Sequence, residues 1–389
     1  MYQPDYQGGS IANLMVSLGQ ACGAPAGTCP PLRQAPAADL GSVTNLVLLV
    51  VDGLGYDLLA ENPGPLAPYL RGCLTSVFPS TTAAAIPTFM TGLPPSQHGL
   101  TGWHMWLREV GNLLAILPLT ARPGAPARQP LPPPDALPAR LFRHPTLYAG
   151  LQRSSYVVSP RFIAHSPFNR YHSRGAARLA YRGLDGPEGL FGALSGLAAK
   201  AGKKFVYGYW PDYDSTAHAH GCRSPEALAA LAAFSQAFIE WLATLGGSDT
   251  LVLVTADHGF IDSPPERRIA LADHPLLADC LALPLCGERR SAWCYLKPGK
   301  ATVFEAYVRQ HLGHAALAMP RERLLAEGWF GPGPAHPELA SRIGDYALLM
   351  RDNWTIYDTL PGEQPLDLLG MHGGLSPAEM RVPLLVARP

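Results

Sequence analysis

Six aspartate and histidine side chains and a short run of hydroxyl residues have the types and spacing that suit metal-assisted chemistry. Carboxylate oxygens and imidazole nitrogens are the ligands that zinc and similar divalent ions take in proteins. Two such ions ~3.5–4 Å apart can activate a nucleophile and stabilise the leaving oxygen of an in-line displacement at phosphorus. The candidate ligands are Asp52, Asp214, His218, Asp257, His258 and His372.

The candidate ligands stand next to predicted strands. Asn45–Val51 and Thr250–Thr255 are apolar runs typical of buried parallel strands, and Lys204–Tyr209 is predicted as a further strand. One or two ligands follow each of these strands, and the sixth precedes the last predicted strand, Val382–Val386. The carboxyl edge of an open parallel sheet is where ligands bind, so such a sheet would gather these side chains. The alternation of helices and apolar strands predicts an α/β fold with a central, parallel-rich sheet flanked by helices.

The segment Phe78–His98 offers a candidate nucleophile. Ser80, Thr81 and Thr82 stand there just before an apolar run. A hydroxyl residue at such a position starts a helix, because it satisfies a backbone N–H that the helix leaves without a partner. Helix N-termini also attract anions, so a hydroxyl there could attack a phosphorus atom that the backbone holds. On this segment alone, a simple helix cap is the better explanation.

Each ligand pair also has a plainer explanation when it is taken alone. Asp214 and His218 stand four residues apart after a strand and could form a hydrogen-bonded turn. Asp257 and His258 could lie in an ordinary exit from a strand into a loop. That all six residues fall into one pattern by chance is improbable, so the pattern as a whole favours a site for two metal ions.

Five motifs, in this order along the chain, carry a resemblance to a known family. The chain resembles the alkaline phosphatase superfamily and, within it, the type I phosphodiesterase and nucleotide pyrophosphatase branch. Together the motifs span most of the chain and are specific, although each is weak alone. They are VDGLGYD at Val51–Asp57, PSTTAAAIPTFMTGLPPSQHG at Pro79–Gly99, DSTAHAHG at Asp214–Gly221, TADHG at Thr255–Gly259 and HGG at His372–Gly374.

The resemblance implies an alkaline phosphatase-like core, a smaller cap and two divalent cations, zinc or alternatively manganese. The implied ligands are Asp214, His218 and His372 for one ion and Asp52, Asp257, His258 and the nucleophile's oxygen for the other. The family's nucleophile lies nine residues before the Thr of a Thr-Gly pair. Counting back from Thr91 selects Thr82 and leaves Thr81 as the neighbouring cap. The implied mechanism is attack by the metal-activated Thr82 hydroxyl, a phosphothreonine intermediate and its hydrolysis.

One departure from the family pattern concerns the substrate class. Many phosphodiesterase members have an Asn downstream of the His-Gly pair that donates to a phosphoryl oxygen, and none stands between Gly99 and Trp106 here. The donor could be the backbone N–H of Thr82, His104, or an arginine of residues 161–182, although those arginines are more simply a solvated face. Trp103 and Trp106 could stack on a base, but core packing is the expectation.

The sequence is therefore compatible with three functions. The leading hypothesis is hydrolysis of a phosphodiester or nucleotide pyrophosphate bond. The alternative within the superfamily is a phosphomonoesterase or phosphonate hydrolase. The alternative from a different class is a non-catalytic metal-binding protein with the same fold. The intact Thr82 and ligand set argue against the last.

Composition bounds the partners and the location. With 389 residues, 47% of them hydrophobic, the chain can bury a large core. Lys plus Arg and Asp plus Glu both number 30, so nothing suggests nucleic-acid binding, and a small phosphate ester, possibly a nucleotide, is the expected partner. The seven cysteines form no CxxC pair, which favours free thiols. No signal peptide or membrane span is evident, so a cytoplasmic protein is expected.

The predicted organisation is a catalytic core of residues 1–265 and 366–389 with a cap or insertion of residues 266–365. Residues 104–147 are expected to be irregular. Eight prolines between Pro118 and Pro138 are too many for a central strand or a helix interior.

Overall fold

The computed structural model describes residues 1–35, 37–364 and 367–389 and contains two seven-stranded sheets. In the first sheet, which has the longer strands, five adjacent strands are parallel, and β18 runs antiparallel between β9 and β2. This confirms the predicted α/β fold with a central, mainly parallel sheet. In spatial order the strands are β2 (Leu70–Thr75), β18 (Arg381–Ala387), β9 (Thr250–Thr255), β1 (Asn45–Val51), β8 (Lys204–Trp210), β6 (Ser154–Pro160) and β7 (Ala177–Tyr181).

The three central strands β9, β1 and β8 are buried along their whole length. β1 and β9 are the continuous apolar runs of the sequence, as expected of strands that helices cover on both faces. The paired register is unbroken from Asn45 with Lys204 to Val51 with Trp210. The carboxyl ends of these strands therefore lie level at one edge of the sheet.

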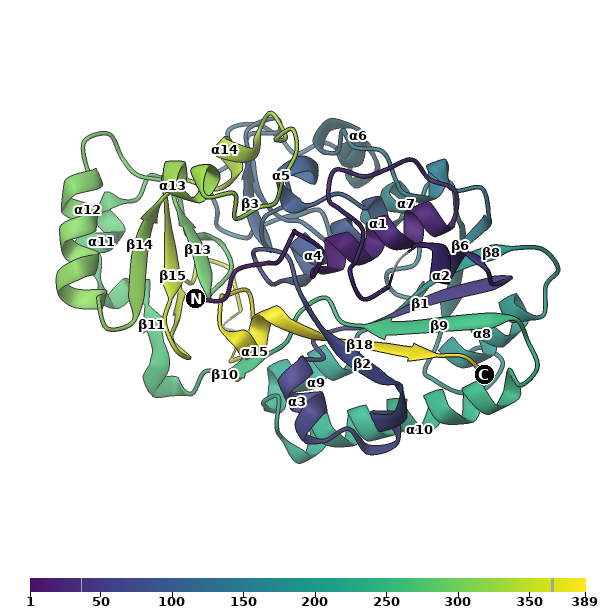
Figure 1. Cartoon of the computed structure of the whole chain (residues 1–389). Coiled ribbons are helices and arrows are strands. Elements are labelled where there is room, and N and C mark those ends of the chain that lie inside the picture. The colour runs from purple at the N-terminus through teal and green to yellow at the C-terminus, as the bar shows by residue number, and fades with distance from the viewer. Residues whose placement is uncertain (36, 365–366) are drawn as a thin grey trace.

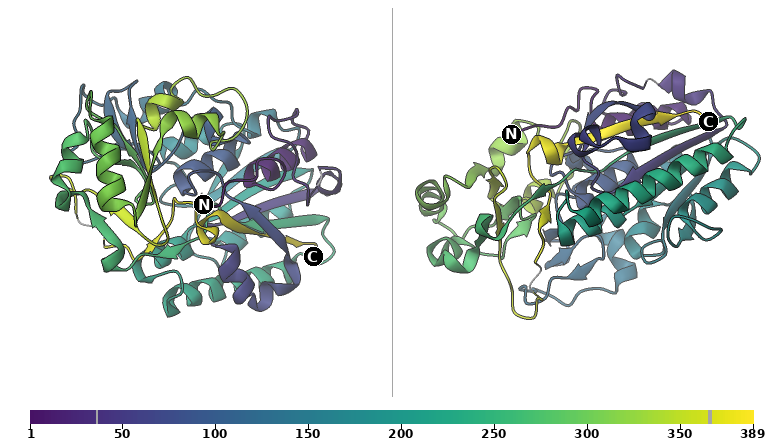
Figure 2. Two further views of the ribbon diagram at one scale, coloured as in Figure 1. Left: turned by 60° about the vertical axis from the view of Figure 1, so that its left-hand side comes forward. Right: turned by 90° about the horizontal axis from the view of Figure 1, so that it is seen from below.

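Helices cover both faces of this sheet, as Figure 1 shows, with α1, α4 and α7 above it and α3, α9 and α10 below. The lower face is crossed by α10, which is prominent in the view from below (Figure 2). The helices of this lobe are α1 (Ile11–Ala21), α2 (Ala37–Gly41), α3 (Tyr56–Glu61), α4 (Thr82–Thr91), α5 (Pro95–His98), α6 (Leu137–Leu141), α7 (Pro167–His172), α8 (Leu190–Ala198), α9 (Asp212–His220), α10 (Pro225–Thr244) and α15 (Pro377–Met380).

By length and composition alone, α10 is apolar enough to cross a membrane. Core helices pass the same test, and the inner side of α10 is core. Phe234 stacks on Trp210 of β8, and Phe238 and Trp241 pack with Phe191 of α8. The burial of these rings against the sheet accounts for the apolar composition of the helix.

The second sheet builds the other lobe from two distant parts of the chain. Residues 104–121, expected to be irregular, supply three short strands, whereas the proline-rich stretch after them is irregular apart from short helical turns. The predicted boundary between residues 365 and 366 lies outside the described residues. The strands are β14 (Ala316–Pro320), β15 (Tyr346–Met350), β13 (Ser291–Cys294), β12 (Cys286–Gly287), β3 (His104–Leu107), β4 (Asn112–Ala115) and β5 (Thr120–Ala121).

The helices of the second lobe are α11 (Pro275–Cys280), α12 (Ala301–Tyr307) with a π-helical turn at Val308–Leu312, α13 (Arg321–Ala326) and α14 (Leu339–Arg342). Two further pairs of short strands are β10 (Ile261–Asp262) with β17 (Gly370–Met371), and β11 (Arg268–Ala270) with β16 (Thr355–Tyr357). The β11–β16 pair packs in the core of the second lobe through Ile269 and Ile356.

Candidate active site

The site begins where the central strands end. Asp52 directly follows β1, and Asp257 and His258 follow β9 after one residue. The register pairs Val50 with Thr255, so Asp52 and Asp257 each come two residues beyond level partners. The turn after β1 needs Gly53, whose φ is +77° and whose N–H donates to Asp257 Oδ1 at 3.1 Å. A side chain at position 53 would also collide with the ring of Phe260.

The other three candidate ligands arrive from α9 and from the segment before β18. Asp214 and His218 lie one turn apart on α9, which starts at the end of β8. His372 follows β17, and the pairing of β17 with β10 holds it close to the end of β9. Because β18 runs antiparallel to β9, a residue that precedes β18 lies at the same edge as residues that follow the parallel strands. The antiparallel direction of β18 thus brings His372 to the same edge as the other candidate ligands.

The candidate ligands lie within a few ångströms of one another. His258 Nε2 is 3.4 Å from Asp52 Oδ1, 3.5 Å from Asp257 Oδ2 and 3.9 Å from Asp214 Oδ1. Asp214 Oδ1 is also 3.5 Å from His218 Nε2 and 3.9 Å from His372 Nε2. The side-chain atoms thus form two adjoining groups, Asp52 with Asp257 and His258, and Asp214 with His258 and His372. His258 stands in both groups, whereas the resemblance assigned it to one.

The three imidazoles are oriented by backbone carbonyls. The Nδ1 atoms of His218, His258 and His372 meet the carbonyl oxygens of Gly370, Gly259 and Ser80 at 2.8, 3.1 and 3.3 Å. A carbonyl oxygen only accepts, so each Nδ1 carries the hydrogen and each Nε2 presents a lone pair to the cluster. Histidines that bind a metal are oriented in the same way, by donating the hydrogen of the other ring nitrogen to a carbonyl or carboxylate oxygen.

The carboxylates of the cluster are electrostatically suited to cations. Burial, and then the charges of Asp214 and Asp257, raise the pKa of Asp52 well above its ordinary value. Burial likewise raises the pKa of Asp214. Asp214 Oδ1 and Asp257 Oδ2 are buried and have no hydrogen-bond partner. Three carboxyl groups packed together with bare oxygens fit divalent ions, which would neutralise the charge and complete the coordination.

Thr82 presents its hydroxyl to this cluster from the first position of α4. Its Oγ1 lies 3.0 Å from His258 Nε2 and 3.5 Å from Asp52 Oδ1. Thr81 occupies the N-cap position, as expected, but its hydroxyl caps no N–H. The carbonyl of Thr81 accepts from Ala84 and Ala85. Among the described residues the N–H groups of Thr82 and Ala83 have no acceptor, so two donors point out of the helix start.

The Thr81 hydroxyl donates instead to Glu288, a residue that no sequence motif selects. Glu288 lies between β12 and β13, and its Oε1 accepts from Thr81 Oγ1 and from the N–H of Trp103, both at 2.7 Å. Trp103 is 39% exposed, so the expectation that it packs in the core is wrong, whereas Trp106 is buried. In the sequence Glu288 is an acidic residue after a glycine, and this pattern is too common to indicate a functional site.

Two of the five arginines of residues 161–182 lie along the same sheet edge. Arg161 and Arg182 follow β6 and β7 and line a hollow of about 390 Å³ with Asp212 and with Phe162, which is 77% exposed. Two hydrogen bonds link the wall of this hollow to the candidate metal ligands. Tyr181 donates to the carbonyl oxygen of Tyr209, and the Tyr209 hydroxyl donates to Asp52.

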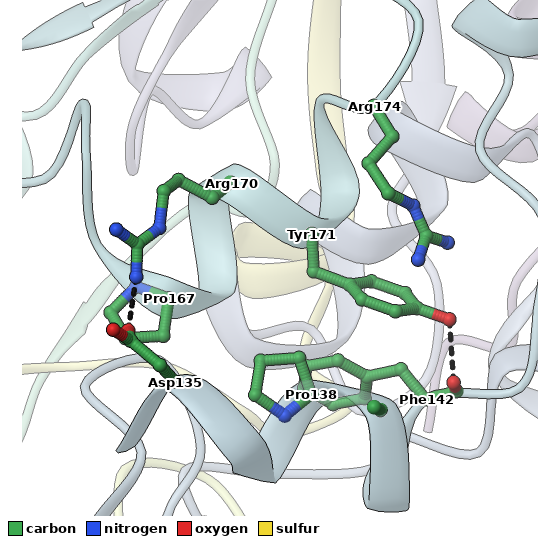
Figure 3. Close-up of a pocket in the computed structure, with 8 residues that line it drawn as sticks. Asp135, Pro138, Phe142, Pro167, Arg170, Tyr171 and Arg174 are labelled. Carbon is green, nitrogen blue, oxygen red and sulfur yellow. Dashed lines mark hydrogen bonds and ion pairs between the residues drawn. The ribbon is translucent and has the colours of Figure 1, made fainter. Parts of the chain in front are cut away.

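The other three arginines are engaged elsewhere. Arg170 pairs with Asp135, and Arg174 lies over the Tyr171 ring, in a separate hollow of about 420 Å³ between α6 and α7 (Figure 3). Arg178 donates to the hydroxyl of Ser173. Each of these three arginines thus has a partner within the protein, and no bound ligand is needed to explain its position.

A buried ion pair supports the loop that carries His372. Arg290, at the start of β13, donates from Nε and Nη2 to the two carboxylate oxygens of Glu379 at 3.0 and 2.9 Å. The same carboxylate accepts from the N–H of Gly374 at 2.8 Å. Both charged side chains are almost fully buried, with 1% and 0% exposed. The pair thus joins the second lobe to the end of the sheet beside His372.

Removal of Arg290 is expected to destabilise the protein strongly. In Arg290→Leu the carboxylate of Glu379 loses its partner while it stays buried, a change that costs about 3–5 kcal/mol. Urea unfolding followed by circular dichroism measures the loss. Arg223→Leu is the matched control, because Arg223 pairs with Glu61 at an exposed site, and its midpoint should stay near that of the wild type. Equal midpoints for the two variants would contradict the structural role.

Comparisons with known proteins bear on the fold and the family of the chain. No curated protein sequence matches the chain. Murine ectonucleotide pyrophosphatase/phosphodiesterase 5 superposes with a TM-score of 0.64 at 17% identity, covering 88% of each chain. The human protein of the same name gives 0.61 at 19% identity, with 88% of each chain covered. Phosphonoacetate hydrolase from Sinorhizobium meliloti 1021 gives 0.61 at 19% identity, covering 87% of this chain and 89% of the hydrolase.

The family model for type I phosphodiesterase / nucleotide pyrophosphatase matches residues 46–375. This span holds all six candidate ligands and Thr82. The match supports hydrolysis of phosphate esters, and the structural likeness supports the fold. The chain belongs to the type I phosphodiesterase / nucleotide pyrophosphatase family.

Proposed function

We propose that this protein hydrolyses phosphate diesters or nucleotide pyrophosphates through a covalent intermediate on Thr82. The observation that carries the proposal is the position of the Thr82 hydroxyl, 3.0 Å from His258 Nε2 at the start of α4 and against two groups of candidate metal ligands. A hydroxyl that only capped a helix would face a backbone N–H instead.

Two divalent ions would be held by side chains that are already oriented. Asp52, Asp257 and His258, with Thr82 beside them, would hold one ion, and Asp214 and His372 with His218 the other. The ions would lower the pKa of the Thr82 hydroxyl and neutralise charge on the phosphoryl oxygens. Nitrogen and carboxylate oxygen ligands suit zinc, and manganese is the alternative.

The residues of the chain supply position and hydrogen bonds. The Thr82 hydroxyl would give up its proton to water, and Oγ1 would attack phosphorus as the bond from phosphorus to the leaving oxygen breaks. The leaving oxygen would take a proton back from water. The N–H groups of Thr82 and Ala83 would donate to phosphoryl oxygens, in the role that the absent Asn fills in other members. Water then hydrolyses the phosphothreonine and restores the hydroxyl.

The substrate is proposed to be a small molecule, with a nucleotide as one candidate. A murine relative with an inactivating threonine-to-alanine replacement was solved with AMP, and the bacterial hydrolase was solved with phosphonoacetate. These two complexes support a small phosphorus compound as substrate, and the second is consistent with the phosphonate alternative. The hollow beside Arg161 and Arg182 could take the remainder of the substrate, because guanidinium groups suit a second anionic group.

The diester proposal predicts a preference between two nitrophenyl esters. The metal-reconstituted protein should hydrolyse bis-nitrophenyl phosphate with a higher kcat/KM than nitrophenyl phosphate. A panel of both esters and a phosphonate, assayed by nitrophenolate or phosphate release, measures the ratio. A clear preference for the monoester would favour the monoesterase alternative, and turnover of the phosphonate alone would favour that hydrolase.

Two further expectations remain predictions. The division into a core of residues 1–265 and 366–389 and a cap of 266–365 is proposed, with residues 104–121 contributing strands to the cap sheet. A cytoplasmic location is proposed from the sequence, and it is supported by seven cysteines that are all free thiols.

A further inference from the structure

A carboxyl group from the second lobe reaches the start of α4, and the mechanism above does not use it. Glu288 accepts from the hydroxyl of Thr81 and the N–H of Trp103, and both donors bond to the same oxygen, Oε1. The main chain of the opposing loop makes room for it, because a Cβ on Gly373 would come within 2.7 Å of the Glu288 side chain. The residue is therefore built into the wall of the site.

The position of Glu288 puts its charge beside the phosphoryl group that Thr82 would attack. The phosphoryl oxygens must lie at the N-terminus of α4, and Glu288 bonds to the residue immediately before Thr82. A carboxylate and a phosphoryl group thus share one helix N-terminus, which would favour either anion alone.

The charge of Glu288 bears differently on the two ester classes. At pH 8.5 a phosphate diester carries one negative charge and a monoester about two. Burial raises the pKa of Glu288 to about 7, so its carboxyl group is ionised at that pH. Repulsion between Glu288 and the phosphoryl group grows with the charge on the phosphoryl group. The hydrogen bonds from Thr81 and Trp103 come from neutral donors, so they do not cancel the charge of Glu288.

We propose that Glu288 is a specificity-determining residue that makes the site select singly charged phosphoryl groups, as in diesters, over doubly charged ones. This inference rests on the proposed function, since it takes the phosphoryl group to lie at Thr82. It names a source for diester preference in a chain that lacks the family's Asn. The selection works by repulsion of the wrong substrate class rather than by added contacts to the right one.

The test is the Glu288→Gln variant, which removes the charge and keeps an oxygen that can accept from Thr81 and Trp103. At pH 8.5 inorganic phosphate, largely doubly charged, should bind about tenfold more tightly to the variant than to the wild type, measured by calorimetry on metal-reconstituted protein. Tenfold corresponds to 1.4 kcal/mol. Binding of dimethyl phosphate, which is singly charged, should change by less than about threefold. The ratio of monoester to diester kcat/KM should rise about fivefold or more.

Glu305→Gln is the matched control, because Glu305 lies in the same lobe on α12 and bonds to Tyr346 away from the site. It should change neither affinity nor the ratio. Unchanged phosphate affinity in Glu288→Gln, or an equal gain for both anions, overturns the inference. If Glu288→Ala loses activity while Glu288→Gln matches the wild type in every measurement, Glu288 only positions Thr81, and the inference is again overturned. If the wild type cleaves neither ester, the proposed function fails, and phosphate binding still decides the role of Glu288.

Discussion

Thr82→Ala will lower kcat for the diester by about 10³-fold or more, while the variant folds and binds metal as the wild type does. The Thr82 hydroxyl faces the cluster, with Oγ1 at 3.0 Å from His258 Nε2. Alanine keeps the helix start, because the N-cap contacts come from the carbonyl of Thr81. Loss of the nucleophile should therefore separate from loss of stability.

Thr81→Ala is the matched control, since it removes the neighbouring hydroxyl from the same helix start. Thr81 is buried and its hydroxyl donates to Glu288, so this variant should lose about 1 kcal/mol of stability and keep most of its activity. Thr82→Ser should retain part of the rate, because the hydroxyl survives. Rapid-quench trapping of acid-stable phosphothreonine in wild type and in both alanine variants tests the covalent step directly.

The opposite pattern would be informative. An inactive Thr81→Ala beside an active Thr82→Ala would mean that the count from Thr91 selects the wrong hydroxyl. If both variants turn over normally, neither Thr81 nor Thr82 is the nucleophile and the covalent mechanism is wrong. Direct attack by water on the phosphate ester would then replace it.

The central sheet could be predicted because its strands are buried on both faces. Such strands are continuous apolar runs, and β1 and β9 coincide with the runs Asn45–Val51 and Thr250–Thr255. Asp52 and Asp257 could be placed at its edge because each follows its strand within two residues. Little can intervene over so short a distance, so local sequence decides where these side chains lie.

Features that depend on long-range contacts could not be derived from local sequence patterns, and the family resemblance alone implied His372 as a ligand. The proximity of His372 depends on the antiparallel course of β18 and on the pairing of β17 with β10. Strands β3 to β5 are short, and β3 is held in the second sheet by its pairing with β12, which is distant in the sequence. Glu288 lies 207 residues from Thr81 and carries no motif around it. Tertiary packing decides each of these, and no local pattern reports it.

Loss of the Asp257 charge should have opposite effects on the apo and the metal-loaded protein. In Asp257→Asn the side-chain oxygen can still accept from the N–H groups of Gly53 and His258, as Oδ1 does at 3.1 Å to each. The variant loses the bare Oδ2 and the charge that repels Asp52. The apo variant should therefore unfold at an equal or higher temperature than the apo wild type, because buried like charges destabilise the fold.

With zinc present the order should reverse. Wild type should bind about two ions per chain and gain stability of about 4 kcal/mol per ion at a thousandfold excess over Kd. Asp257→Asn should bind about one ion fewer, gain less stability, and lose about 10³-fold in kcat. Asp39→Asn is the matched control, because Asp39 lies on α2, is exposed and stands outside both ligand groups. Elemental analysis and thermal unfolding with and without a chelator provide both measurements. Equal metal content in wild type and Asp257→Asn, or a lower unfolding temperature of the variant in the apo state only, would show that the buried carboxylates serve the fold rather than a pair of ions.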